Sequence, residues 1–177
     1  MEKIKELTRS EREIKIKDKA GWIITVLAAL LAINTLIGGN NSSKILNNTI
    51  AVNDTFAFYQ AKSIKQTAYE IAAIEAIARN DKATAAQYST KAASYESEPD
   101  TGEGKKELLA TARKLQVARD EAKQRSPWFT YSGSLFQIAI VLLTASILAV
   151  STALFSGSIL VGIIGSITMS QAIWMWF

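Results

Sequence analysis

Three long apolar stretches interrupt a chain that is otherwise rich in charged residues. Two lie in the C-terminal third, where residues 126–177 contain no Asp, Glu, Lys or Arg. Each is close to the roughly 20 residues with which a helix crosses the hydrocarbon layer of about 30 Å. A transmembrane barrel would need alternating polar and apolar positions, which this stretch lacks. We therefore predict a transmembrane hairpin over residues 132–177, with helices at about 134–154 and 158–176 joined by a turn at 155–158.

The third apolar stretch, residues 22–38, predicts one more transmembrane helix near the N-terminus. It begins with Trp22, a residue type common at membrane surfaces, and it ends at Gly38-Gly39. The charged residues 1–21 before it predict a solvated helix, with a segment lying on the membrane surface as the alternative. The Asn-rich residues 39–54 after it are typical of a loop or helix cap just outside the bilayer.

A repeating pattern in residues 39–131 predicts a helical hairpin outside the membrane. Apolar residues recur at seven-residue steps, as in helices that pack on one another: Ile50, Ala57, Ile64 and Ile71. Asn80-Asp81 predicts an N-cap for a second helix, Lys82 to about Glu96. After a turn at residues 97–104, a third helix from Lys105 to about Arg125 carries a matching stripe: Leu108, Ala112, Leu115 and Ala122. We therefore predict an all-α fold with three transmembrane helices and an extramembrane antiparallel helical hairpin, a short coiled coil, between the first and second spans.

Composition and charge exclude several classes of function. The chain has no Cys and no His, which removes thiolate chemistry, disulfides and the usual zinc or haem ligands. The formal net charge is +4 and basic residues alternate with acidic ones, so the one-sign patch of nucleic-acid-binding proteins is missing. The sequence contains no phosphate-binding Gly-rich loop and no nucleophile motif. We expect no catalytic residues, no cofactor, no metal and no nucleic acid partner.

One segment resembles a known family. Residues 53–66 read NDTFAFYQAKSIKQ. They are similar to the segment Asp-x-Trp-Ala-Tyr-Tyr-Gln-Ala-Lys-Ser-Ile-Lys of a bacterial family of small three-span membrane proteins, catalogued as a domain of unknown function (DUF4337). Phe56 and Phe58 stand at two of the aromatic positions, and residues 59–65 match. The resemblance extends to the basic stretch ending at Arg125 and to the closing hairpin, and it implies an architecture but no activity.

The same segment is the best candidate for a functional surface, because it gathers polar and aromatic residues: Phe56, Phe58, Tyr59, Gln60, Ala61, Lys62, Ser63, Ile64 and Lys65. On a helix, positions 59, 63 and 66 fall on one side and positions 62, 65 and 69 on another. An enzyme site would still need an acid or base from elsewhere in the fold. We interpret the cluster as a packing or partner surface. The alternative is that Lys62 and Lys65 bind lipid phosphates.

Small residues recur every four positions in the last two predicted spans. They are Ser158, Gly162, Ser166 and Ser170 in the last span, and Ala145, Ala149 and Ala153 in the span before. Such stripes predict close helix packing or an oligomer contact, and a hydroxyl-lined pore is the alternative. The aromatic residues expected at the membrane surfaces are Trp22, Trp128, Phe129, Tyr131, Trp174 and Trp176.

These patterns predict an integral membrane protein that acts through assembly, as a homo-oligomer or as an accessory or scaffold subunit of a membrane complex. A small oligomeric channel is the alternative, and a membrane enzyme ranks last. The resemblance implies a bacterial inner membrane. Seven Lys or Arg residues before the first span place the N-terminus in the cytoplasm, with the hairpin and the C-terminus outside. The basic residues before the second span favour the opposite orientation, but the first span usually dominates.

Overall fold

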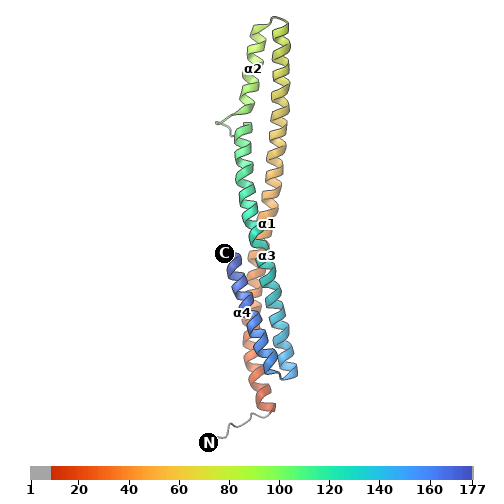
Figure 1. The fold of residues 1–177 in the computed structure, drawn as a ribbon, viewed down its shortest axis with the longest axis vertical. Helices are drawn as coiled ribbons and strands as arrows, with labels where there is room; N and C mark the ends of the chain where they lie inside the picture. Colours follow the sequence, from red (N-terminus) through yellow and green to blue (C-terminus); the bar gives the residue numbers. More distant parts are fainter. Residues whose placement is uncertain (1–8, 177) are drawn as a thin grey trace. The chain divides into compact units, whose positions relative to one another are not determined.

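The computed structural model describes residues 9–176, and within this range the chain forms four helices and no strand. They are α1 (Arg9–Ala78), α2 (Lys82–Glu96), α3 (Lys105–Ala149) and α4 (Thr152–Trp174), shown in Figure 1. The predicted all-α class is confirmed. Helices α1, α3 and α4 each contain a segment long and apolar enough to cross a membrane, which makes the chain compatible with membrane insertion. Of the predicted N-terminal segment, residues 1–8 lie outside the described residues.

The chain divides into two compact units. The apolar unit comprises residues up to Ser43 together with residues from Ala122 onward, and the polar unit comprises Lys44–Glu121. Helices α1 and α3 are each divided between the two units, with one part in each.

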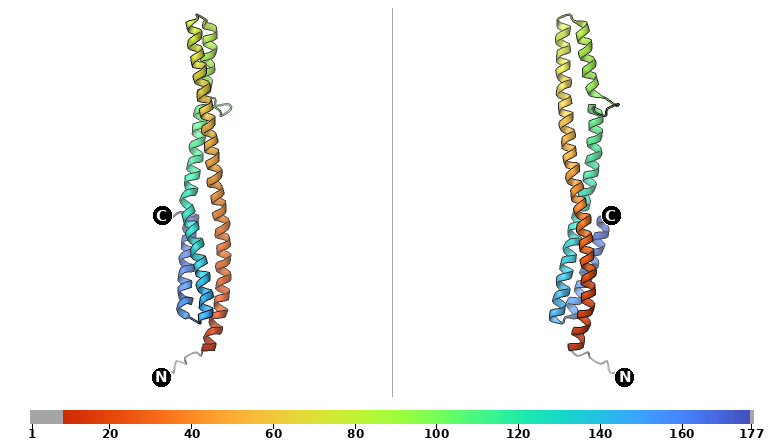
Figure 2. Two further views of the ribbon diagram at one scale, coloured as in Figure 1. Left: turned by 90° about the vertical axis from the view of Figure 1, so that its right-hand side faces the viewer. Right: turned by 180° about the vertical axis from the view of Figure 1, so that it is seen from behind.

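The apolar unit is a bundle of three helical segments, from α1, α3 and α4, that lie side by side in both views of Figure 2. Its buried core joins Leu27 of α1, Phe136 and Leu143 of α3, and Met169 of α4. Glycines allow the helices to approach closely, because a Cβ on Gly162 would lie 3.1 Å from Leu27 Cδ2. Close packing of this kind supplies the van der Waals contacts that hold helices together in lipid, where no hydrophobic force acts between them.

The turn between α3 and α4 comes earlier than we expected. Helix α3 ends at Ala149 and α4 begins at Thr152, whereas the predicted helices ended at 154 and began at 158. Val150 adopts a left-handed conformation with φ of 49°, and the N–H of Ser151 donates to the Ser146 carbonyl. The Ser151 side chain then accepts a hydrogen bond from the Leu154 N–H and caps α4. Residues 156–158, which were expected to form the turn, are therefore helical. The Ser151 side chain already pairs with a backbone N–H at the start of α4, so the helix begins before them.

Helix α1 continues through Gly38-Gly39 and through the Asn-rich residues 39–54, so the predicted helix end and loop are wrong. Gly38 is a packing position instead, because a Cβ there would lie 3.2 Å from Phe129 Cβ. Asn41 donates its side-chain amide to the Ala122 carbonyl at 2.8 Å. These contacts between α1 and α3 outweigh the weak helix preference of Gly and Asn, which is about 0.7–1 kcal/mol per residue.

Helix α3 also continues past the point where we expected it to end, since Pro127 lies inside it. An interior proline removes one backbone hydrogen bond and costs about 3 kcal/mol. A full break would leave several backbone N–H and C=O groups without helical partners, which is costlier. The chain therefore keeps one helix where the sequence predicts two.

The polar unit contains the second part of α1, all of α2 and the first part of α3. Helix α2 and the beginning of α3 follow each other along α1 (Figure 2). Asn80, with φ of 59°, ends α1, and the Asp81 N–H donates to the Ala76 carbonyl. The Asp81 side chain then accepts from the Thr84 N–H at 3.1 Å and caps α2. The predicted N-cap and both predicted ends of α2 are confirmed.

Candidate functional site

The predicted cluster around Lys62 divides between two sides of α1. Tyr59, Lys62, Gln66 and Tyr69 are half-buried and follow one another at three- and four-residue steps. They therefore form one face, which continues into the buried Ala73 and Ala76. This grouping corrects the sequence interpretation, which placed positions 59 and 62 on different sides.

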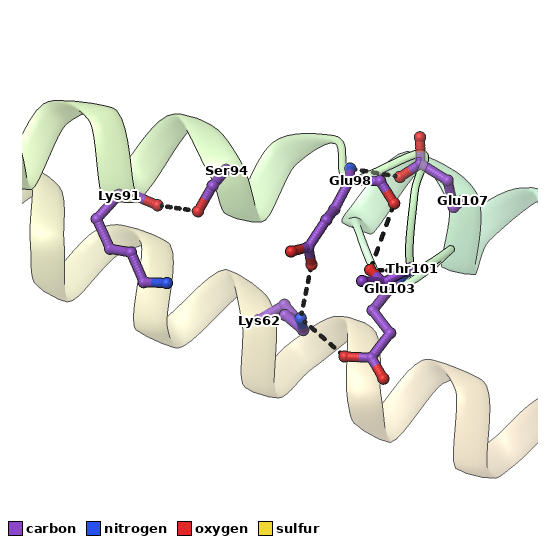
Figure 3. A network of polar contacts seen from close by, with 7 residues as sticks. All are labelled: Lys62, Lys91, Ser94, Glu98, Thr101, Glu103 and Glu107. Atoms are coloured by element: carbon purple, nitrogen blue, oxygen red, sulfur yellow. Dashed lines mark hydrogen bonds and ion pairs between the residues drawn. The ribbon is translucent and has the colours of Figure 1, made fainter.

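Lys62 of α1 contacts the segment that joins α2 to α3 (Figure 3). Its ammonium lies 3.7 Å from a Glu98 carboxylate oxygen and 3.4 Å from one of Glu103. The ring centre of Tyr95 lies 5.6 Å from the same nitrogen, within the range of a cation–π contact. Lys62 is thus a cross-link between α1 and the turn at residues 97–104.

Lys105, the first residue of α3, makes similar contacts, but it reaches from α3 to α1, whereas Lys62 reaches from α1 to the turn. Its ammonium donates to Glu96 at 3.0 Å and to the Gln66 side-chain oxygen at 2.9 Å, and it lies 5.6 Å from the ring centre of Tyr59. The Lys105 hydrogen bond and charge lower the pKa of the Glu96 carboxyl. Lys62 and Lys105 together hold the end of α2 and the start of α3 against α1.

Glu107 joins the two ends of the turn directly. Its carboxylate accepts a hydrogen bond from the Ser97 hydroxyl at 2.7 Å and from the Glu98 backbone N–H at 3.2 Å. These two hydrogen bonds, the Ser97 one first, lower the pKa of Glu107. Beside this carboxylate lies Gly104, where there is no room for a side chain. Nearby, the Ser94 hydroxyl donates to the Lys91 carbonyl at the last turn of α2 (Figure 3).

Next to this network, three tyrosines form a contact between α1 and α2. The ring of Tyr69 lies 5.9 Å from that of Tyr88 and 5.8 Å from that of Tyr95, the second pair being stacked. Ala85 and Ala92 are buried on the same side of α2. Aromatic pairs at this separation contribute about 0.5–1.5 kcal/mol beyond the area they bury.

The other residues of the predicted cluster lie outside the network. Phe56 and Ser63 are half-buried, and five residues are exposed: Phe58, Gln60, Ala61, Ile64 and Lys65. Lys65 makes none of the contacts of Lys62, so the two lysines are not equivalent.

The apolar repeat of α1 faces outward. Ile50, Ile64 and Ile71 are 50%, 71% and 53% exposed, and Ala57, Ala61 and Ala68 are exposed as well. At about 100° per residue, this stripe lies roughly opposite the face of Tyr59, Lys62, Gln66 and Tyr69. The structure thus assigns the polar and aromatic face to contacts within the chain and leaves the isoleucine stripe uncovered.

The predicted small-residue stripes are only partly inside the bundle. Ser158 and Gly162 are buried, Ser166 is exposed and Ser170 is half-buried. The other buried residues of α4 are Gly165, Met169, Gln171 and Ala172. The hydroxyls of Ser158 and Ser166 donate to carbonyls of their own helix. Of the stripe predicted on the preceding span, Ala145 is half-buried and Ala149 is exposed at the end of α3. Ala153 is exposed but lies in α4, because the turn comes at residues 150–151, so the three alanines do not share one helix.

The predicted interfacial aromatics also differ in position. Trp22, Tyr131, Trp174 and Trp176 are exposed, and the last two are in edge contact at 6.5 Å. Trp128 is half-buried and lies 6.3 Å from Tyr131. Phe129 is buried against Gly38, so it belongs to helix packing.

Three polar contacts of the apolar unit were missed in the sequence. Asn34 is buried, donates to the Phe129 carbonyl at 2.9 Å and accepts from the Ser132 hydroxyl at 2.5 Å. Arg125 donates to the Ile173 carbonyl at 3.0 Å, at the C-terminal end of α4 where a cation is favoured. Asn34 could have been singled out as an amide within an apolar stretch, whereas its partners depend on how the helices pack.

A family model matches almost the whole chain. The family described as "Domain of unknown function (DUF4337)" matches residues 16–175, which include the polar network and the apolar segments of α1, α3 and α4. No curated protein and no solved structure matches the chain. The match agrees with the resemblance of residues 53–66, and the chain belongs to the DUF4337 family.

Proposed function

We propose that this chain is a non-catalytic integral membrane protein that acts by assembling with copies of itself. The apolar unit spans the membrane, and the polar unit is an antiparallel helical hairpin outside it. The abrupt change from uncharged to charged sequence near Arg125 supports this division. A bacterial inner membrane, with the N-terminus in the cytoplasm, follows from the family resemblance and from the basic residues before α1's apolar stretch.

The observation that carries the proposal is the exposed isoleucine stripe of α1. In water, isoleucine side chains that stay uncovered forgo about 25 cal/mol for each Å² of apolar surface. Ile50, Ile64 and Ile71 are separated by fourteen and seven residues, and multiples of seven are the pattern with which helices pair over several turns. Since contacts within the chain already use the opposite face, the stripe is available to a second copy.

The polar network supports a structural role for the most conspicuous lysines. Lys62 and Lys105 are each engaged by carboxylates and lie over a tyrosine ring. In this arrangement the two lysines hold α2 and the start of α3 against one face of α1, and this contact fixes the position of the isoleucine stripe on the opposite face. Their function in the proposal is therefore to support the contact surface.

Site-directed photocross-linking in native membranes tests the proposal. The chain contains no cysteine, so Ile64→Cys can carry a single benzophenone on the stripe. We expect adducts whose mass is a multiple of this chain. Glu70→Cys, an exposed position of the same helix roughly 120° away, is the matched control and should give far less adduct.

Two outcomes would contradict the proposal. An adduct between position 64 and an unrelated protein would indicate an accessory subunit of a larger complex. Equal labelling from positions 64 and 70 would mean that the stripe is no specific contact.

A further inference from the structure

Gln137 places an amide without a partner on the outer surface of α3. Its side chain is exposed and makes no hydrogen bond to any residue from 9 to 176. It lies ten positions after Pro127 and twelve before Ala149, or about 15 Å and 18 Å along the helix. In a membrane-spanning α3 it is therefore near the middle of the hydrocarbon layer. A polar group at that depth is costly unless another protein group pairs with it.

Gln137 is the centre of a regular face of α3. Exposed residues recur at alternating four- and three-residue steps, and we call them the Gln137 face: Thr130, Ser134, Gln137, Val141, Thr144 and Leu148. This is the spacing of a helix–helix seam. The hydroxyls of Thr130, Ser134 and Thr144 donate to carbonyls of their own helix at 3.3, 3.0 and 2.9 Å. The hydroxyls are thus satisfied, and the amide of Gln137 is not.

A groove beside this face offers space for side chains of another helix. It has a volume of about 300 Å³ and lies between α1 and α3. Ser134 and Gln137 line one side, and Thr35, Gly38 and Ser42 of α1 line the other. Thr35 donates to the Leu31 carbonyl, so its hydroxyl is also satisfied within the helix. Small residues along a groove permit a neighbouring helix to approach closely.

We propose that the Gln137 face is the contact between two copies of this chain within the membrane, and that their Gln137 amides pair across a two-fold axis perpendicular to the membrane. Copies inserted with the same topology carry Gln137 at the same depth. A primary amide both donates and accepts, so it can pair with an identical group. An unrelated helix would have to supply a polar group at that depth by coincidence. The inference rests on the proposed self-assembly and adds its intramembrane contact.

Disulfide trapping of the full chain in native membranes tests this contact. We expect Gln137→Cys to form a disulfide-linked dimer under mild oxidation. Ile138→Cys is the matched control, because position 138 is also exposed and lies at the same depth about 100° around the helix. It should remain monomeric.

Energy transfer between labelled copies in phosphatidylcholine vesicles tests the role of the amide. We expect Gln137→Leu to weaken the dimer by roughly 3- to 18-fold, the effect of one hydrogen bond between transmembrane helices. Gln137→Asn keeps the amide and should retain most of the affinity. Equal affinity of the Leu variant and the native chain would overturn amide pairing.

The photocross-linking and disulfide-trapping results together distinguish the intramembrane contact from the proposed self-assembly. If the photoprobe at position 64 captures copies of the chain while Gln137→Cys stays monomeric, the intramembrane contact is wrong and self-assembly stands. If Gln137→Cys is trapped with a different protein, the self-pairing is wrong. If neither position yields a dimer, both proposals fail.

Discussion

Gly104, the residue before α3, lies against Ser97 and Glu98, the residues that follow α2. A Cβ at this position would fall 2.7 Å from the Ser97 Cα and still closer to the Glu98 backbone nitrogen and the Glu107 carboxylate. Two of these three atoms are backbone, so the turn itself would have to move. The space at Gly104 is therefore a condition for the hydrogen bonds of Glu107.

We predict that Gly104→Ala opens the junction between α2 and α3. Overpacking of this kind typically costs about 1–3 kcal/mol. Where cleavage follows the population of the open form, trypsin should cut after Lys105 or Lys106 about 5- to 160-fold faster. Gly39→Ala is the control, since a Cβ there meets nothing within 4 Å and the residue lies inside α1. Unchanged cleavage in Gly104→Ala would show that the turn tolerates a side chain.

We also predict that the polar unit loses stability at acid pH. The pKa values of Glu96 and Glu107 are lowered from the ordinary 4.5 by their hydrogen bonds, to Lys105 and to Ser97. A carboxyl with a lowered pKa stabilises the folded state above its ordinary pKa, and this contribution disappears as the pH falls through the folded value. Stability should thus be constant above about pH 5 and decline below 4.5.

Thermal unfolding followed by circular dichroism between pH 7 and pH 3 would measure this decline. Glu107→Gln should be less stable than the native chain at pH 7, and the difference should shrink toward pH 3. Parallel pH profiles of the two proteins would exclude Glu107 as a contributor.

At the scale of the helices, local sequence predicted some ends and not others. Asn80 and Asp81 end α1 and begin α2 as expected, because a left-handed residue and a side-chain cap satisfy backbone groups locally. Gly38, Gly39 and Pro127 do not end helices, although they are residues with weak helix preference. Their preferences, of at most about 3 kcal/mol, compete with helix packing and with the cost of unpaired backbone groups.

Periodicity showed that α1 has an apolar stripe but not which partner the stripe meets. We expected Ile50, Ile64 and Ile71 to pack on another helix, either of the hairpin or of a second copy, and they are exposed within the single chain. The inward face instead uses Tyr59, Lys62 and Gln66, whose partners lie about 40 residues away in sequence. A polar face is recognisable as internal only when the opposite charges and rings of its partner are known.

At the scale of the whole molecule, the proposed topology makes a prediction about orientation. With three spans, the N-terminus and the polar unit lie on opposite sides of the membrane. The basic residues before the first span favour an N-terminus in the cytoplasm. Five others precede the second span and favour the reverse: Arg113, Lys114, Arg119, Lys123 and Arg125. The first span usually dominates, and the rule weakens for connecting segments longer than about 60 residues.

Cysteine labelling decides between these orientations in the cysteine-free chain. We expect an impermeant maleimide to label Ser89→Cys in intact cells and to leave Ser10→Cys unlabelled until the membrane is opened. Ser89 is exposed on α2, so its reactivity reports the side of the membrane. The reverse pattern would place the polar unit in the cytoplasm.

The helical class, the three apolar segments, the ends of α2 and the family could all be predicted from the amino-acid sequence, since they depend on composition and on neighbours within a few residues. Three features became evident only in the folded chain: the continuity of α1 and α3, the pairing of Lys62 with Glu98 and Glu103, and the outward direction of the isoleucine stripe. These features depend on contacts between residues far apart in the chain. Periodicity can group side chains on one face, but the direction of that face is set by the packing of the other helices.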